Sequence, residues 1–561
     1  MTDIFNYRRR RSSVTVVGRG DDGGRVLIGG DNKVRVQSMT TTDTADTESS
    51  IAQAERIADA GGELVRLTTQ GVREAENLKN ISRGMRRDGY VTPLVADVHF
   101  NPRVADVAAL YAEKVRINPG NYADPARTFK HIDYTDEEYA DELKRIEQRF
   151  VPFLDICREH GTAIRIGVNH GSLSDRIMSR YGDTPEGIVE SCMEFLRICK
   201  RQRFDNVVIS VKASNTVVMV LSVRLLVAEM EKEDMHYPLH LGVTEAGEGE
   251  DGRIKSTVGI GALLADGIGD TIRVSLSEEP EAEIPVARHL VDYISRREGH
   301  EPIKGVAAEC FDYLRPVRRK TRAVGIIGGD NVPVVIGADC DVTDYDFMIV
   351  DTLETSDIEH LRNSPETVVL CKSDSPNRVG AMRAVVHGLM CAGLYNPVVF
   401  MPEYDTSSAD ELRLEAAADM GPLMIDGLTD GIWLRNSGGI DEKTVTDTAF
   451  GILQAGRLRT TRTEYISCPG CGRTLYDLRS TIARIKEATK DMTGLKIGIM
   501  GCIVNGPGEM ADADYGYVGA GRGKISLYRR KDCVAKNIPE EDAVKRLLEL
   551  IDKDVKMKNE E

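Results

Sequence analysis

The amino-acid sequence predicts an α/β protein in three parts. Residues 1–297 are expected to form a (β/α)8 barrel, residues 298–456 an inserted α/β domain, and residues 457–561 a smaller α+β domain that contains closely spaced cysteines. Two observations lead to this division. Short β-like runs alternate regularly with helical stretches through the first half of the chain, and a cysteine- and glycine-rich pattern occurs near its end. A length of 561 residues is ample for two to four domains.

The barrel prediction rests on eight strand-like runs, which are Val34–Thr40, Leu64–Leu67, Leu94–Asp97, Lys114–Asn118, Ala163–Gly167, Val207–Lys212, Pro238–Val243 and Thr271–Leu276. Helical patterns lie between them, for example at Ser49–Ala60, Asp141–His160, Thr184–Arg203 and Thr216–Lys232. Eight strands, each followed by a helix, are typical of a (β/α)8 barrel. A doubly wound open sheet is the alternative. It usually has fewer strands and a glycine-rich loop after the first one, and no such loop follows Val36.

The middle segment predicts a second α/β domain. Its strand-like runs are Val334–Ile336, Phe347–Val350, Thr367–Leu370, Val398–Phe400 and Met424–Ile425, with helical stretches at Arg378–Ala392 and Ser408–Met420. Its strand ends carry no dense set of polar side chains, so we expect a structural role. Cys340, Cys371 and Cys391 lack metal-like spacing and are expected to be buried thiols.

The last segment predicts a βαβ-type α+β unit. Helices are expected at Ser480–Lys490 and Pro539–Lys553, and strands at Leu495–Met500 and Lys524–Tyr528. Pro539 followed by two glutamates is a typical helix start.

Three cysteines and a glutamate in this segment form a candidate metal centre. Cys468 and Cys471 are three residues apart, Cys502 follows a predicted strand, and the turn-forming run 505–508 can bring Glu509 back toward Cys502. Three thiolates with one carboxylate suit an iron–sulfur cluster. Structural zinc and a thioredoxin-like dithiol are the alternatives. Zinc sites usually show a second cysteine pair or a histidine pair, and neither occurs near Cys502.

Composition narrows the function classes. The net charge of −16 and an acidic isoelectric point argue against general binding to nucleic acids or to acidic membranes. No apolar run approaches the length that spans a bilayer, and the N-terminus lacks the apolar core of a secretory signal. Eleven cysteines, an odd number scattered along the chain, suit a reducing cytoplasm better than a disulfide framework.

Charged side chains gather at the predicted carboxyl ends of the barrel strands, where such barrels hold their active sites. Same-parity residues of a strand point to the same side. The residues concerned are Arg66, Asp97, His99, Arg116, Asn118, Arg165, Asn169, Ser210, Lys212, His240, Thr244, Glu245, Arg273 and Ser275. Four arginines and a lysine on one rim would repel one another without an anion. In an acidic protein, a small phosphate-bearing substrate is the simplest such anion.

These motifs also carry a resemblance to a known family. The runs at 37–40, 93–100, 115–121, 165–173, 211–214 and 241–247, together with 468–473 and 500–509, resemble the signature of 4-hydroxy-3-methylbut-2-enyl diphosphate synthases. The resemblance covers nearly the whole chain outside the middle segment. That segment is similar to the insertion in the long, three-domain form of the family.

The resemblance implies an oxidoreductase of isoprenoid biosynthesis. Its substrate would be 2-C-methyl-D-erythritol 2,4-cyclodiphosphate, opened and reduced by two electrons with loss of water. It implies a [4Fe–4S] cluster on Cys468, Cys471, Cys502 and Glu509, with ferredoxin or flavodoxin as the electron donor. The predicted roles follow. Glu245, His99, Asp97 and Glu509 would be catalytic, and substrate would be held by Arg66, Arg116, Asn118, Arg165, Asn169, Lys212, His240, Thr244, Arg273 and Ser275.

Two other function classes stay open at this point, a zinc-dependent barrel hydrolase acting on a sugar phosphate and a non-enzymatic iron–sulfur carrier. The carrier leaves the charged barrel mouth without a purpose. The chain is expected to be a monomer or a homodimer. The middle domain is expected to act as a spacer that lets the C-terminal domain close over the barrel of its own chain. Enlargement of a dimer interface is the alternative role.

Overall fold

The structure is a computed structural model that describes residues 3–20, 24–124, 131–503, 506–510 and 512–560. The chain divides into two compact units. The barrel unit consists of Arg11–Glu248, Gly269–Ala287 and the chain from Arg462 onward. The middle unit consists of the N-terminal arm up to Arg10, Gly249–Ile268 and Arg288–Thr461. The predicted domain boundaries stay a prediction.

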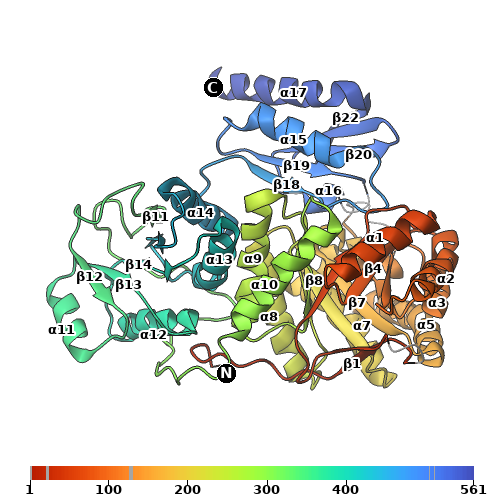
Figure 1. Cartoon of the computed structure of the whole chain (residues 1–561), viewed down its shortest axis with the longest axis horizontal. Helices are drawn as coiled ribbons and strands as arrows, with labels where there is room; N and C mark the ends of the chain where they lie inside the picture. Colours follow the sequence, from red (N-terminus) through yellow and green to blue (C-terminus); the bar gives the residue numbers. More distant parts are fainter. Residues whose placement is uncertain (1–2, 21–23, 125–130, 504–505, 511, 561) are drawn as a thin grey trace. The chain divides into compact units, whose positions relative to one another are not determined.

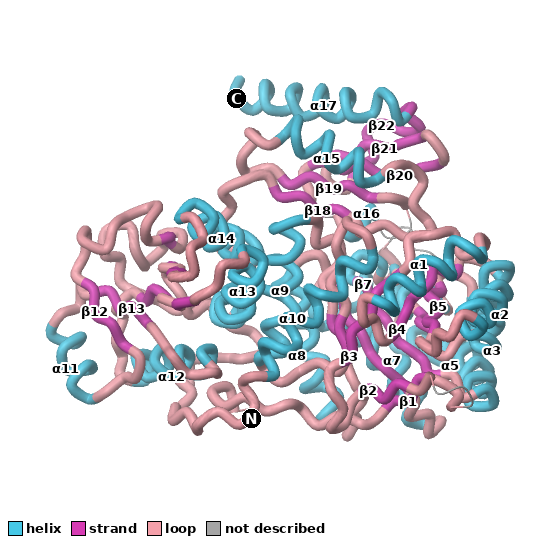
Figure 2. The backbone as a smooth tube through the Cα atoms, in the orientation of Figure 1, coloured by secondary structure: helices cyan, strands magenta, loops and turns pink. Residues whose placement is uncertain are grey.

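The predicted barrel is confirmed. Its eight parallel strands lie in the order β8-β7-β6-β5-β4-β3-β10-β9, and a bridge between Ile209 and Leu239 joins the two end strands. Figure 2 shows the strands in magenta. Their bounds are β3 (Arg35–Met39), β4 (Leu64–Thr69), β5 (Leu94–Val98), β6 (Lys114–Ile117), β7 (Ala163–Asn169), β8 (Val207–Lys212), β9 (His240–Leu241) and β10 (Thr271–Ile272).

Helices follow the strands as predicted. They are α1 (Thr47–Asp59), α2 (Val72–Arg87), α3 (Pro102–Tyr111), α4 (Pro119–Tyr122), α5 (Asp136–His160), α6 (Asp175–Tyr181), α7 (Pro185–Arg201) and α8 (Thr216–Lys232), with a 3-10 turn at His170–Ser172. Helix α5 begins five residues before its predicted start at Asp141. Thr135 and Glu138 form a capping box there, with reciprocal side-chain-to-backbone bonds that satisfy the first amides of the helix.

The amino end of the barrel is closed by a hairpin that the sequence analysis did not predict. Strands β1 (Thr15–Val17) and β2 (Val26–Ile28) pair antiparallel. Val17 and Ile28 pack on a buried layer of small and branched side chains from four barrel strands, namely Leu64, Val95, Ala163 and Val208. This end of the barrel is therefore mostly apolar, with the buried Lys114 opposite Val95 and Ala163 as an exception, and the charged cluster lies toward the carboxyl ends of the strands.

The chain from Arg462 onward, here called the C-terminal region, forms a five-stranded sheet in the order β18-β19-β20-β21-β22. β18 (Glu464–Ser467), β19 (Lys496–Met500) and β20 (Tyr515–Gly521) run parallel, and β21 (Lys524–Arg529) and β22 (Asp532–Pro539) continue antiparallel. Helices α15 (Leu478–Thr489), α16 (Gly506–Glu509) and α17 (Glu540–Glu560) complete it. The α+β prediction is confirmed, although β18, β20 and β22 were not predicted individually.

The middle unit contains a parallel sheet in the order β11-β16-β14-β13-β12. The bounds are β11 (Val334–Val335), β12 (Phe347–Val350), β13 (Val368–Cys371), β14 (Val398–Phe400) and β16 (Gly431–Ile432), with a small pair β15 (Glu403–Tyr404) and β17 (Arg435–Asn436). The helices of this unit and of its borders are α9 (Gly249–Ala265), α10 (Glu283–Ser295, preceded by a 3-10 turn at Pro280–Ala282), α11 (Thr355–Asn363), α12 (Arg378–Cys391), α13 (Ala409–Ile425) and α14 (Glu442–Ala455). Figure 1 labels most of these elements.

One predicted strand of the middle unit is wrong. Met424–Ile425 is the last turn of α13, and the strand is β16. Pro422 lies inside this helix, and proline removes a helical donor. The carbonyl that Pro422 leaves free, that of Ala418, instead receives the Arg297 guanidinium at 3.5 Å, so the helix continues. Two of the three thiols predicted to be buried are also wrong: Cys371 is buried, but Cys340 is partly exposed and Cys391 is exposed.

Candidate functional site

A cavity of about 90 Å³ lies at the carboxyl ends of the barrel strands, entirely within the barrel unit. One wall comes from the barrel and the other from the loops that follow β18 and β19. Its lining includes most of the predicted site residues, namely Arg66, Asp97, His99, Arg116, Arg165, Asn169, Lys212, Thr244, Glu245, Arg273, Ser275, Cys468, Cys471 and Cys502. It also includes Met39 and Arg473, which the sequence analysis had not selected as site residues.

Strand register brings the barrel side chains together. Asp97 on β5 lies opposite Arg116 on β6, and Arg116 lies opposite Arg165 on β7. Residues opposite each other in neighbouring strands share a face of the sheet, so all three enter the barrel interior. All three side chains are nearly completely buried.

Asp97 is the centre of an ionic cluster. It accepts a bond of 3.0 Å from Arg116 Nη1, one of 3.3 Å from Arg473 Nη2, and lies 4.0 Å from Arg66 Nε. Burial alone would raise the pKa of Asp97, but the guanidinium groups of Arg66 and Arg116 hold it well below its ordinary value. Burial and neighbouring Arg116, whose Nη1 contacts His99 Nε2, lower the pKa of His99 well below its ordinary value. His99 is therefore neutral at neutral pH.

Arg116 is held rigidly from its other side. Nη2 donates to the carbonyl of Gly167 at 2.8 Å and to Oδ1 of Asn169 at 3.1 Å. A Cβ atom at position 167 would lie 2.5 Å from Arg116 Nε, so only glycine leaves room for this guanidinium. The sequence Gly-Val-Asn at the end of β7 thus supplies both the space and an acceptor.

Arg165 and Arg273 are used differently. Nε and Nη1 of Arg165 are buried and find no hydrogen-bond partner among the residues that the structure describes. Arg273 makes a two-point ion pair with Glu283, with both bonds at 2.9 Å. Glu283, which the sequence analysis missed, neutralises Arg273, whereas Arg165 remains a buried fork without an anion.

Two further carboxyl groups belong to the site, those of Glu245 in the cavity lining and of Glu509 near it. Thr244 Oγ1 donates to Glu509 Oε2 at 2.8 Å, and Ser214 Oγ donates to the Glu509 carbonyl at 2.8 Å. Glu509 Oε1 is buried and without a partner among the described residues. Burial and the nearby Glu245 carboxylate raise the pKa of Glu509 well above its ordinary value. Glu245 has a left-handed backbone (φ +50°), a conformation that non-glycine residues seldom adopt outside functional or turn positions.

Two predicted substrate contacts do not line the cavity. Asn118 caps α4, where its Oδ1 accepts from the Gly120 amide at 3.1 Å and its Nδ2 donates to Ser172 Oγ at 2.8 Å. His240 is fully buried with one ring nitrogen 3.4 Å from Thr271 Oγ1. Glu509, although bonded to Thr244, is also not part of the lining.

The three cysteines reach the same cavity from two neighbouring parallel strands. Cys468 and Cys471 follow β18, and Cys502 follows β19. None of these three cysteines is in a disulfide, and the Gly501 amide donates to Cys468 Sγ at 3.4 Å. Among the described residues, no three histidine, cysteine or acidic side chains are gathered closely enough to hold a metal ion. The predicted turn at 505–508 begins at Asn505, which lies outside the described residues.

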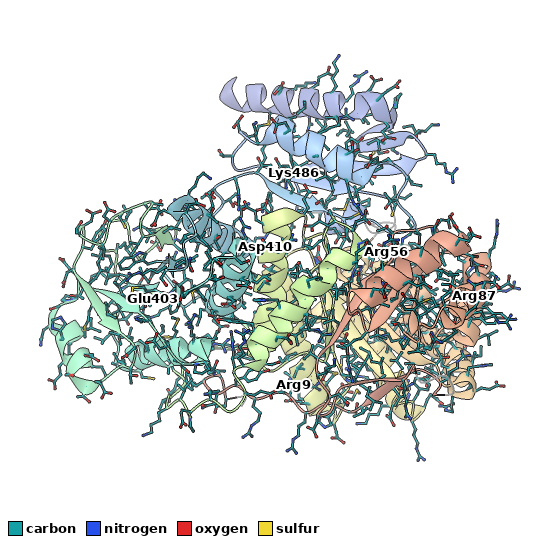
Figure 3. All side chains as sticks on the ribbon, viewed as in Figure 1. Arg9, Arg56, Arg87, Glu403, Asp410 and Lys486 are labelled. Carbon is teal, nitrogen blue, oxygen red and sulfur yellow. The ribbon has the colours of Figure 1, made fainter. Side chains whose placement is uncertain are left out.

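Contacts within the chain hold these loops over the barrel mouth. Ser277 Oγ donates to the Cys468 carbonyl at 3.0 Å. A Cβ at Gly508 would lie 1.7 Å from the Gly171 carbonyl, so α16 and the loop after β7 touch through their backbones. At the edge, Lys486 on α15 pairs with Glu248 at 3.4 Å, and Figure 3 labels this lysine.

Comparisons with known proteins agree with this geometry. Residues 22–288 match the model of the GcpE TIM-barrel domain, and residues 464–553 match that of the GcpE protein C-terminal domain. A protein of Phocaeicola vulgatus named 4-hydroxy-3-methylbut-2-en-1-yl diphosphate synthase (flavodoxin) is 61% identical over 98% of this chain and 98% of its own length. Proteins of the same name from Bacteroides fragilis and Bacteroides thetaiotaomicron are each 60% identical, over 98% and 99% of this chain and 96% and 99% of their own lengths.

Proposed function

The chain belongs to the family of 4-hydroxy-3-methylbut-2-en-1-yl diphosphate synthases, and from this premise we propose how its own residues carry out the reaction. The chain is an oxidoreductase that opens the ring of 2-C-methyl-D-erythritol 2,4-cyclodiphosphate. The reaction consumes two electrons and two protons and releases one water molecule. Its product is (E)-4-hydroxy-3-methylbut-2-enyl diphosphate. The observation that carries the proposal is that three thiols and a buried set of cations line one cavity.

The residues present fit a [4Fe–4S] cluster. Cys468, Cys471 and Cys502 face the same cavity as free thiols, and thiolate is the ligand that such clusters take. Glu509 keeps one buried oxygen without a partner, which suits it as a fourth, weaker ligand. The cluster, when bound, supplies electrons one at a time, which no side chain can do.

The barrel residues bind and orient the substrate. Arg66, Arg116 and Arg165 present guanidinium groups to the cavity, and the diphosphate supplies the anion they require. Burial and the nearby arginines lower the pKa of Lys212 well below its ordinary value, and a bound diphosphate favours its protonated form. Arg165 provides a guanidinium group whose Nε and Nη1 have no hydrogen-bond partner among the described residues, so both can bind a phosphate. Arg273 is neutralised by Glu283, so it shapes the cavity wall with Ser275 and adds little net charge.

The protons of the reaction are donated and accepted by side chains at the cavity. Glu245 lines it and approaches Glu509, and like charge at close range favours sharing of a proton between two carboxyl groups. Neutral His99 can donate or accept at the same wall, while Asp97 stays ionised and orients Arg116. We assign Glu245 as the acid that protonates the departing hydroxyl, because its carboxyl group lines the cavity and lies close enough to Glu509 to raise the pKa of that group.

Electrons reach the protein from a small redox protein. The relatives are named for flavodoxin, and we propose flavodoxin here, with ferredoxin as the alternative donor. None of the helices in the described part of the chain combines the length and apolar character that crossing a membrane requires. Eleven cysteines with no disulfide among the described ones suit reduction in the cytoplasm.

The test is anaerobic turnover. The purified protein, reconstituted with iron and sulfide, should be brown and should convert the cyclodiphosphate to the enyl diphosphate with reduced flavodoxin. A zinc hydrolase would be colourless and would release product without a reductant. A carrier would be brown and inactive. Either result would overturn the proposal.

A further inference from the structure

Arg473 is the single charged side chain that the C-terminal region contributes to the cavity lining among the described residues. It lies two residues after Cys471 and extends into the barrel, where Nη2 donates to Asp97 Oδ2 at 3.3 Å. Only 9% of the side chain is exposed. Nη1 is buried and has no hydrogen-bond partner within the described residues. Nη2 of this guanidinium is therefore bonded to the barrel, whereas Nη1 is available to a ligand.

The loop that carries Arg473 is seated on the barrel. A Cβ at Gly472 would lie 2.6 Å from the carbonyl of Thr42, so the loop can make this approach only with glycine at that position. Gln70 Nε2 lies 3.5 Å from the Gly472 carbonyl. The position of Arg473 thus depends on the seating of the C-terminal region on loops of the barrel.

The charges around Asp97 do not balance. One carboxylate lies within ion-pair distance of three guanidinium groups, those of Arg66, Arg116 and Arg473. Two positive charges are left over in a buried setting, where unneutralised charge is costly. An anion with several oxygens, such as a phosphate group, removes this cost by bonding to the free nitrogens.

We propose that Arg473 is a substrate-binding residue that couples phosphate binding in the barrel to the seating of the C-terminal region. Nη2 stays on Asp97 while Nη1 takes a phosphate oxygen, so one side chain bridges the barrel, the substrate and the thiol loop. Coupling of this kind is reciprocal: substrate tightens the seating, and seating tightens substrate binding. The inference rests on the proposed function, since it takes the cyclodiphosphate as the ligand.

A matched control is available in Arg479. It also belongs to the C-terminal region and bonds to the barrel, through Glu279 and, at 3.0 Å, the Glu278 carbonyl. Its side chain is 42% exposed and lies outside the cavity lining. Because an exposed ion pair contributes little free energy, loss of the Arg479 side chain should barely change the seating, and this side chain does not reach the cavity.

The experiment measures substrate dissociation constants anaerobically in iron-replete wild type, Arg473→Ala, Arg473→Lys and Arg479→Ala. Hydrogen exchange of the seam segments 275–278 and 466–473 is followed with and without the cyclodiphosphate. Arg473→Ala should bind about tenfold to a hundredfold more weakly, and substrate should no longer increase protection of the seam. Arg473→Lys should lie between, because an ammonium keeps the charge but not the two-point geometry. Arg479→Ala should match wild type in affinity and in substrate-induced protection.

The outcomes separate the two ideas. If wild type itself does not bind the cyclodiphosphate, the proposed function is wrong. If wild type binds and both Arg473 variants bind equally well with unchanged protection, the coupling role of Arg473 is wrong. If Arg473→Ala fails to fold or to retain iron, Arg473→Lys decides, and wild-type affinity in that variant would also overturn the role.

Discussion

The hydroxyl of Thr244 donates a hydrogen bond of 2.8 Å to Oε2 of Glu509, joining the loop after β9 to α16 across 265 positions of sequence. This bond is the side-chain hydrogen bond that holds the Glu509 carboxyl group, and the Gly171 backbone also interacts with that group. Because the carboxyl group is buried, its orientation depends on Thr244.

Thr244→Val should disturb Glu509 without changing side-chain volume much. The buried carboxyl group would lose its donor, and we expect kcat to fall by about tenfold to a hundredfold. Thr244→Ser retains the hydroxyl and should keep most of the activity. Double-mutant analysis with Glu509→Gln checks the cause: the two losses should be clearly non-additive. Additive losses would show that Thr244 acts on something other than Glu509.

Cys468→Ser, Cys471→Ser and Cys502→Ser should each abolish assembly of the cluster, because three thiolates are needed to hold it. Iron content and visible absorbance after anaerobic reconstitution are the measurements. Cys340→Ser is the matched control, since this thiol is also partly exposed but lies in the middle unit. Full iron in Cys502→Ser would remove that residue from the ligand set.

Arg165→Ala should weaken substrate binding by about 1.5–3 kcal/mol, the usual contribution of a charge-assisted contact. Iron content should not change, because Arg165 lies on β7 and not on the thiol loops. Arg165→Lys should recover only part of the affinity. Wild-type affinity in Arg165→Ala would exclude Arg165 from the phosphate site.

Closure of the C-terminal region over the barrel of its own chain predicts the result of a mixing experiment. Arg473 to Asp97 and Ser277 to Cys468 are contacts within one chain. Mixing inactive Arg165→Ala and Cys502→Ser proteins under subunit exchange should therefore restore no activity. Closure across a dimer would instead restore up to about a quarter of wild-type activity. Such recovery would contradict the spacer role proposed for the middle domain while leaving the site assignments in place.

Lys114 gives a prediction about stability and pH. Its Nζ is fully buried and has no partner among the described residues. Burial, and then Arg165 and Arg66, lower its pKa well below the ordinary value of 10.5. In the folded protein the Lys114 amine is therefore neutral at a pH where the same amine is protonated in the unfolded chain. Proton binding favours the unfolded state, so this contribution to stability rises with pH until about the unfolded value.

Lys114→Met should accordingly stabilise the protein at pH 7, by about 1–3 kcal/mol, the usual cost of an unpartnered buried polar group. The gain should shrink as pH approaches 10, because the unfolded lysine also becomes neutral. Denaturant unfolding at pH 7 and pH 10 measures the difference. Arg66, Arg165 and His240 are the neighbouring groups that titrate or carry charge. An equal gain at both pH values would mean that Lys114 is not neutral in the folded state.

Local patterns were sufficient to predict the barrel and most of its site. Strand parity places Asp97, Arg116 and Arg165 inside the barrel, because side chains alternate strictly along a strand. The spacing of Cys468 and Cys471 likewise identifies the thiol loop, because it depends only on residues that are close together in the sequence. By contrast, β1, β2 and β18 have only three or four residues each, and β20 carries glycines at 516, 519 and 521, which weaken a strand pattern in sequence. Such strands form where the rest of the fold offers partners.

Tertiary structure decided which of the charged residues remain available to a ligand. Nothing near Arg273 in sequence shows that Glu283 will neutralise it, and nothing in the turn after Cys471 shows that Arg473 will reach Asp97, 376 positions away. Asn118 likewise looked like a substrate contact and is a helix cap. Sequence patterns determine which face or end of an element a residue occupies. The free energy of a buried charge depends instead on its partners in space, and those partners are set by packing between distant segments.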